Sequence, residues 1–324
     1  MRRWLLFVAI AALPGVSRAD LVLYGKIYAE VAQETQGSGA TRIDKTTLDD
    51  AQNTGRFGLR FSQDLENGLQ AFGKYEFQLG TTNSGDNFEP RETYVGLKGR
   101  FGSFALGQFE GAYKITGGAE FDPFFGTSLE ARGNGGMSSS AYGTSNFINH
   151  AVQYQSPSLD VTGDWKFTTT VQYGVDSTPG VADADRGSYL AGVDLGDSAT
   201  DFIGAVAHDH ARGKDNWKLG IRHRDGDVTY LIQQEKVEEG GYDPAGKGQF
   251  LLGGMHYQVG NLLYVAQVGD YKSDAPGSDA SYWGFGLRYY LARNIWIVGG
   301  YRQTQSNLAA FDGKAWAAGL RYDF

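Results

Sequence analysis

The last ten residues, Ala315-Trp-Ala-Ala-Gly-Leu-Arg-Tyr-Asp-Phe324, alternate between two kinds of side chain. One face is apolar and ends in aromatic rings, with Trp316, Leu320, Tyr322 and Phe324 among its members. The other face carries only small or charged residues. Successive side chains of a β-strand point to opposite faces, so this period of two predicts a strand with one apolar and one polar face.

The same alternation recurs at residues 282–291 and in Arg56-Phe-Gly-Leu-Arg-Phe61. In a soluble β-sandwich the apolar faces would form a core and the polar faces would meet solvent. In a transmembrane barrel the apolar faces meet lipid, with aromatic girdles at the two interfaces. The faces opposite the apolar stripes are rich in Gly and charge, which suits a water-filled lumen and favours the barrel.

The composition excludes several other classes of protein. The chain has 324 residues, of which 47 are Gly and none is Cys. So much Gly argues against a helical enzyme, and the absence of Cys excludes thiolate catalysis, disulfides and Cys-based metal sites. The mean hydropathy is −0.37, and after residue 19 no apolar stretch approaches the length of a transmembrane helix. Barrel strands of about 10 alternating residues escape such averages.

The N-terminal segment is predicted to be a secretory signal peptide. Two arginines precede the apolar run 4–13, and small residues precede Ala19, where cleavage is expected. A membrane anchor is the alternative, but it would need about 20 apolar residues. Removing residues 1–19 takes three arginines away and changes the net charge from −8 to about −11. The remaining residues 20–324 are expected to form one domain, and their acidity excludes nucleic-acid binding.

Connections between the candidate strands alternate between short and long. Short turns such as Asp225-Gly226-Asp227 are strong hairpin signals, whereas long polar stretches occupy residues such as 34–52 and 111–147. We count sixteen candidate strands, with 14 and 18 as alternatives. The sequence therefore predicts an all-β fold, a 16-stranded antiparallel transmembrane β-barrel with short periplasmic turns and long extracellular loops.

Several segments resemble the Gram-negative general porins over most of the chain. The matching segments are Asp20–Lys26, Arg56–Phe61 with Leu65–Leu69, Arg91–Gly99, Ala151–Pro157 and the terminal Tyr-Asp-Phe324. The resemblance implies a homotrimer in the bacterial outer membrane, in contact with lipids and lipopolysaccharide, through which small hydrophilic solutes and ions diffuse passively. It also implies that Phe324 is recognised during barrel assembly.

Residues 111–147 are the longest stretch without alternation, and they occupy the place of the porins' third loop, which folds inward and constricts the pore. Within them, Glu120-Phe-Asp-Pro-Phe-Phe-Gly126 resembles the family's Pro-Glu-Phe-Gly turn, with Phe124 where glutamate is common. We therefore expect Glu120 and Asp122 on the acidic side of the constriction, with Glu130 and Glu110 as weaker candidates.

Alternation places a further set of charged residues in the lumen on the early strands. The expected basic side of the constriction is Lys26, Arg56, Arg60, Lys74 and Arg91, and Glu76 joins the acidic side. Cations facing anions would create a transverse field that orients dipolar solutes. The alternative is that these cations only solvate the lumen or pair across strands. Because the basic candidates outnumber the acidic ones, our hypothesis is weak anion selectivity.

Two local features fit the pattern less well. A family arginine after the constriction loop is missing, and Arg132 is a candidate substitute within the loop. Alternation points Glu92 outward toward lipid, where a trimer interface would make it tolerable.

Three alternative functions remain open. A solute-specific porin would carry a run of aromatic residues along the pore, which we do not find. An outer-membrane enzyme of the phospholipase or protease type, built on a smaller barrel, would need a Ser/His or carboxylate pair at one position on the barrel. The five His show no such pairing with a serine by their spacing. A soluble lectin or adhesin would need neither the long loop nor a terminal Phe. His208 and His210 have the spacing of two metal ligands, but the sequence offers no third ligand, so we expect no metal. We also expect no cofactor and no catalytic residues.

Overall fold

The computed structural model describes residues 19–50, 54–82, 88–140, 142–144, 147–175, 185–244 and 246–324, so the predicted signal peptide lies outside this part except for Ala19. None of the described helices has the length and hydropathy that a membrane-crossing helix requires. The strands are β1 Asp20–Gln36, β2 Ile43–Asp49, β3 Arg56–Asp64, β4 Gln70–Gln78, β5 Pro90–Gly99, β6 Gly102–Glu110, β7 Phe147–Gln155, β8 Leu159–Thr162, β9 Trp165–Gly174, β10 Tyr189–Gly196, β11 Thr200–Asp209, β12 Lys214–Asp225, β13 Val228–Val237, β14 Gly248–Val259, β15 Leu262–Ser273, β16 Ala280–Ala292, β17 Ile295–Ser306 and β18 Gly313–Asp323.

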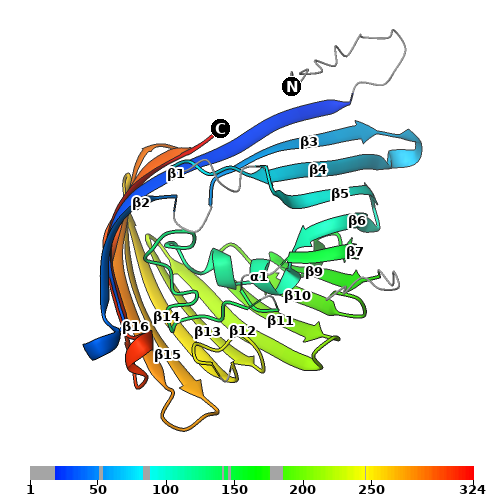
Figure 1. Ribbon diagram of the computed structural model, residues 1–324. Helices are drawn as coiled ribbons and strands as arrows, with labels where there is room; N and C mark the ends of the chain where they lie inside the picture. The colour runs from blue at the N-terminus through cyan, green and yellow to red at the C-terminus, as the bar shows by residue number, and fades with distance from the viewer. Residues whose placement is uncertain are drawn as a thin grey trace, which may run out of the picture.

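These strands form one closed antiparallel β-barrel (Figure 1). The ring closes where β1 pairs with β18, from Lys26 opposite Asp323 to Gln36 opposite Gly313. β2 and β3 pair with successive parts of β1, and β7 and β8 pair with successive parts of β9, so each couple acts as one interrupted strand. The 18 labelled segments therefore make 16 barrel strands, which confirms the predicted fold class.

The predicted long loop at residues 34–52 is wrong, because most of it is strand. β1 continues to Gln36, and β2 pairs back onto it. Polar contacts join the two strands, including an ion pair of 2.7 Å between Lys45 and Glu34. A strand with polar side chains on both faces lacks the apolar alternation that identifies a strand, which is why the pattern missed it.

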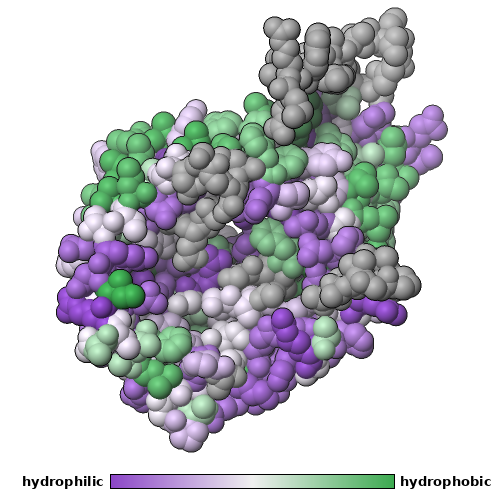
Figure 2. Space-filling view, viewed as in Figure 1, coloured by the Kyte–Doolittle hydropathy of each residue, from purple (hydrophilic) through white to green (hydrophobic). Residues whose placement is uncertain are grey.

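The two faces of the barrel differ in polarity as alternation predicts. Large apolar side chains such as Leu23, Leu106 and Leu320 are exposed on the outside. Figure 2 shows hydrophilic side chains around the central hollow and hydrophobic ones on the outer flanks. Outer rings also cluster, as where the Tyr301 ring lies 4.5 Å from that of Trp316. The outer surface is thus suited to lipid and the inner one to water.

Residues 111–140 and 142–144, between β6 and β7, run through the lumen, and we call them the inner loop. It contains α1 (Ala112–Ile115) and the short 3₁₀ helix η3 (Gly118–Glu120), and α1 appears inside the ring of strands in Figure 1. Side chains of the wall hold it: the Tyr282 hydroxyl donates to the Leu129 carbonyl at 2.8 Å, and the Gln233 side chain accepts the Gly118 N–H at 2.8 Å.

Candidate functional site

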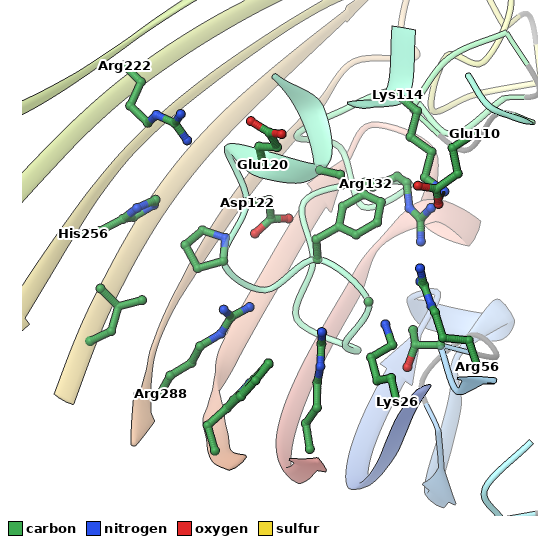
Figure 3. Close-up of a pocket in the computed structure, with 18 of the residues that line it drawn as sticks. Lys26, Arg56, Glu110, Lys114, Glu120, Asp122, Arg132, Arg222, His256 and Arg288 are labelled. Atoms are coloured by element: carbon green, nitrogen blue, oxygen red, sulfur yellow. Dashed lines mark hydrogen bonds and ion pairs between the residues drawn. The ribbon is translucent and has the colours of Figure 1, made fainter. Parts of the chain in front are cut away.

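A cavity of about 680 Å³ lies beside the inner loop in the middle of the barrel. Figure 3 shows Arg222, His256 and Arg288 on one side of the loop and Lys26 and Arg56 on the other. Its lining contains nine basic residues and three acidic ones. The basic residues are Lys26, Arg56, Arg91, Lys114, Arg132, Arg222, Arg224, Arg288 and Arg321, and the acidic ones are Glu110, Glu120 and Asp122.

The strand register explains how residues far apart in the sequence meet here. Lys26 lies opposite Arg56 where β1 pairs with β3, and opposite Asp323 where β1 pairs with β18. Asp323 is two residues from Arg321, so both residues point to the same, inner face. The basic wall therefore continues across the closure of the barrel, from the last strand to the first.

Glu76 lies at the centre of the early basic residues, not opposite them. Its side chain is 1% exposed and lies 3.1 Å from Arg91, 3.2 Å from Lys74 and 3.6 Å from Arg56. The Tyr24 hydroxyl also donates a hydrogen bond of 2.8 Å to it. One buried carboxylate thus balances part of the charge of three cations.

Glu92 points into the lumen, which corrects the outward orientation that alternation predicted. The pairing of β4 with β5 shifts by one residue between Tyr75 and Phe77, as at a β-bulge. Such a shift moves a side chain to the other face of the sheet. Glu92 consequently forms an ion pair with Lys74.

The predicted acidic residues of the inner loop lie in different environments. Asp122 is buried and accepts the backbone N–H groups of Phe124 at 2.8 Å and Ala131 at 2.7 Å, so its carboxylate folds the loop itself. Burial raises the pKa of Asp122. Glu130 is buried too and pairs with Arg132 at 2.9 Å.

Glu120, in contrast, is exposed at the end of η3 and lines the cavity. Desolvation inside the barrel raises the pKa of Glu120, while the nearby charge of Arg222 acts in the opposite direction. Glu110, the other weaker candidate, pairs with Lys114 at 2.8 Å and with Arg91 at 3.5 Å. The acidic residues therefore do not form a wall that faces the cations.

The five predicted basic residues all point into the lumen, but they do not all line the same space. Lys26, Arg56 and Arg91 line the cavity beside the inner loop, whereas Arg60 and Lys74 line an adjoining cavity of about 410 Å³. The Arg60 guanidinium lies over the Tyr24 ring, 4.1 Å from its centre. Among the described residues, no carboxylate lies within 4.0 Å of the Lys26 ammonium.

The sequence analysis missed the basic residues of the later strands. Arg222 and Arg224 lie on β12 and both pair with Asp201, at 2.7 Å and 2.8 Å. Arg288 on β16 and Arg321 on β18 belong to segments whose alternation was already evident at residues 282–291 and 315–324. Following the polar face of those segments would have placed both arginines in the lumen.

The excess of basic residues around the cavity attracts anions electrostatically. Cations line it on both sides of the inner loop (Figure 3), and they outnumber the acidic lining residues by nine to three, although carboxylates outside the lining such as Glu76, Asp201 and Asp323 pair with several of them. Inside low-dielectric walls, charges of one sign raise the local concentration of the opposite ion.

In the described part of the chain, no group of three or more His, Asp or Glu is placed to hold a metal ion. His208 instead pairs with Asp215 at 2.9 Å.

Comparisons with known proteins agree with this architecture. A family model described as Gram-negative porin matches residues 7–310. The major outer membrane protein P.IB of Neisseria meningitidis serogroup B is 30% identical over 120 residues, which cover 36% of each chain. The match thus spans about a third of the length of that curated relative.

Solved structures share the fold over nearly the whole chain. An anion-selective porin from Comamonas acidovorans superimposes with a TM-score of 0.76 at 21% identity, covering 95% of this chain and all of that one. OmpT of Vibrio cholerae, solved in a trimer form, gives a TM-score of 0.67 at 16% identity, covering 94% of this chain and 99% of that one.

Proposed function

Because the chain belongs to the Gram-negative porin family, we propose that it forms a water-filled outer-membrane channel through which small hydrophilic solutes and ions diffuse passively. The closed barrel supplies the path across the membrane, and the inner loop narrows it. The family and the fold indicate a channel rather than an enzyme. His208 and His223, whose ring nitrogens contact Asp215 and Thr200, do not line the central cavity.

The channel prefers anions, because nine basic residues against three acidic ones line the central cavity. This excess is the observation that carries the proposal. A structural neighbour of this chain is itself described as an anion-selective porin, which supports the same preference. The excess of basic residues lies on both sides of the inner loop. A diffusing ion therefore meets a positive potential across the whole cavity rather than a transverse field.

The basic side of the constriction consists of Lys26, Arg56 and Arg91, with Arg60 and Lys74 in the adjoining cavity. Glu120 is the principal acidic residue of the constriction. Asp122 fixes the inner loop, and Glu76 fixes the basic cluster.

The assembly is a homotrimer surrounded by outer-membrane lipids and lipopolysaccharide. The trimeric form of a structural neighbour supports this assembly, and a heat-dissociable trimer on a detergent gel would test it.

Reconstitution of the purified barrel tests the proposed activity. In planar bilayers we expect discrete conductance steps, and in proteoliposomes we expect swelling that becomes slower as the neutral sugar in the medium becomes larger. Swelling with one sugar only, irrespective of size, would favour a solute-specific porin. A barrel that inserts but conducts nothing would contradict the proposal.

The anion preference should increase as the pH falls from about 7.5 toward about 4, where an ordinary carboxyl group titrates. Glu120 has a raised pKa, so its carboxylate takes up a proton at a higher pH than an ordinary glutamate does, and the cavity then loses a negative charge. Asp194 and Asp201 add to this raised pKa, and Arg222 opposes it. Reversal potentials at the two pH values provide the measurement.

Glu120→Gln is the matched variant for this experiment. We expect it to show the stronger anion preference already at neutral pH and a smaller change on acidification, because the titrating carboxylate at position 120 is absent. An identical pH response in the variant and the wild type would exclude Glu120 as the titrating group.

A further inference from the structure

Many cations of the lumen lie over aromatic rings. Among the described residues, ten pairs place a Lys or Arg within 6 Å of a ring centre, and every pair belongs to the inner wall or the inner loop. The rings involved are Tyr24, Tyr113, Phe121, Phe125, Phe147 and Trp296.

An aromatic ring and a carboxylate hold a cation with different consequences for the pore. A carboxylate fixes the cation but cancels its charge, as where Asp201 holds Arg222 and Arg224. The face of a ring attracts a cation through its quadrupole and carries no net charge, so the full positive charge remains. Cations held on rings therefore contribute more to the field in the cavity.

Trp296 holds two cations in this way. It lies on the inner face of β17, 9% exposed, and lines the cavity. Its ring centre is 4.4 Å from the Arg321 guanidinium carbon and 5.6 Å from that of Arg288. The register supports this placement, because Trp296 lies opposite Arg321 on one neighbouring strand and opposite Tyr290 on the other.

The charges of these two arginines are balanced to different degrees. Arg321 has a carboxylate partner, Asp323, at 2.8 Å on its own strand. For Arg288, no carboxylate lies within 4.0 Å among the described residues, and its Nε makes no hydrogen bond to them. The ring of Trp296 is therefore the neighbour that holds the Arg288 guanidinium, and no ion pair within the described part of the chain cancels the charge of Arg288. Tyr290 also interacts with the Arg288 side chain.

We propose that Trp296 is a positioning residue for anion selectivity, whose indole keeps the Arg288 and Arg321 guanidiniums at the cavity wall without neutralising them. This inference rests on the proposed function of an anion-preferring channel. Trp296 does not itself bind the permeating ion. Removing the ring takes away the contact that holds both guanidiniums at the wall, and the positive potential at that wall decreases.

Reversal potentials of Trp296→Leu and Trp296→Phe in a KCl gradient test the proposal. We expect the ratio of chloride to potassium permeability to fall by about half in Trp296→Leu. Trp296→Phe retains a ring and should keep most of the wild-type ratio, a rescue that a purely space-filling role does not predict. Trp296→Met provides a second ring-free variant of similar length should the leucine variant fail to insert.

Trp283→Leu is the matched control, because it removes a large aromatic residue from the outer face, where Trp283 is 37% exposed. It should leave the permeability ratio unchanged. The inference is overturned if wild type prefers anions, Arg288→Gln lowers the ratio, and Trp296→Leu retains the wild-type value. A wild-type channel without anion preference would instead contradict the proposed function.

Discussion

Replacing Glu76 with Gln is expected to lower the free energy of unfolding of the barrel by about 3 kcal/mol. The wild-type carboxylate is buried, with Arg91, Lys74 and Arg56 within 3.6 Å. The variant keeps the size of the side chain but leaves three cations close together with less opposing charge. Breaking a buried ion pair by removing one partner is costly because the remaining charges have already lost their solvation.

Urea unfolding of the barrel in detergent micelles, followed by tryptophan fluorescence, measures this loss. Asp160→Asn is the control, because it removes a carboxylate from an ion pair with Lys166 in which both side chains are more than half exposed. Such a pair contributes less than about 0.5 kcal/mol. Equal stability of Glu76→Gln and wild type would show that Glu76 does not anchor the basic cluster.

The double substitution Lys26→Glu with Arg288→Glu is expected to lower the ratio of chloride to potassium permeability by about tenfold. Neither cation has a carboxylate within 4.0 Å among the described residues, so both substitutions place new negative charges in the lining without breaking an ion pair. The lining would change from nine basic and three acidic residues to seven and five. A unit charge about 7 Å from an ion in water contributes about 0.6 kcal/mol before screening, and four units change here.

Reversal potentials of the double variant and wild type provide the measurement. Lys166→Glu is the matched control, because it reverses a charge on a side chain that is 54% exposed and absent from the central cavity. It should leave the ratio unchanged. If the double variant and this control behaved alike, the net charge of the protein, rather than the cavity, would determine selectivity.

Alternation was sufficient to predict the barrel, because most strands have one face toward lipid and the other toward water. It failed at β2, where that contrast is missing, and at Glu92, which lies beside an irregularity in the strand pairing. β2 was taken for a loop because it is polar on both faces, and Glu92 was placed outside because the shift beside Tyr75 cannot be read from a repeat of two.

The site was predictable only in part for a related reason. Alternation places Lys26 and Arg56 on the inner face, and the structure brings them to one cavity. It cannot tell which partner a charged side chain will find. Asp122 and Glu120 are two residues apart, yet Asp122 is buried and accepts two backbone hydrogen bonds, whereas Glu120 is exposed. Such differences depend on the tertiary path of the inner loop.

The most direct test of the central claim is the reversal potential of the wild-type channel in a KCl gradient across a planar bilayer at neutral pH. The excess of basic over acidic residues in the lining of the central cavity predicts a potential of the sign set by chloride. A potential of the sign set by potassium would contradict an anion-preferring channel governed by that lining.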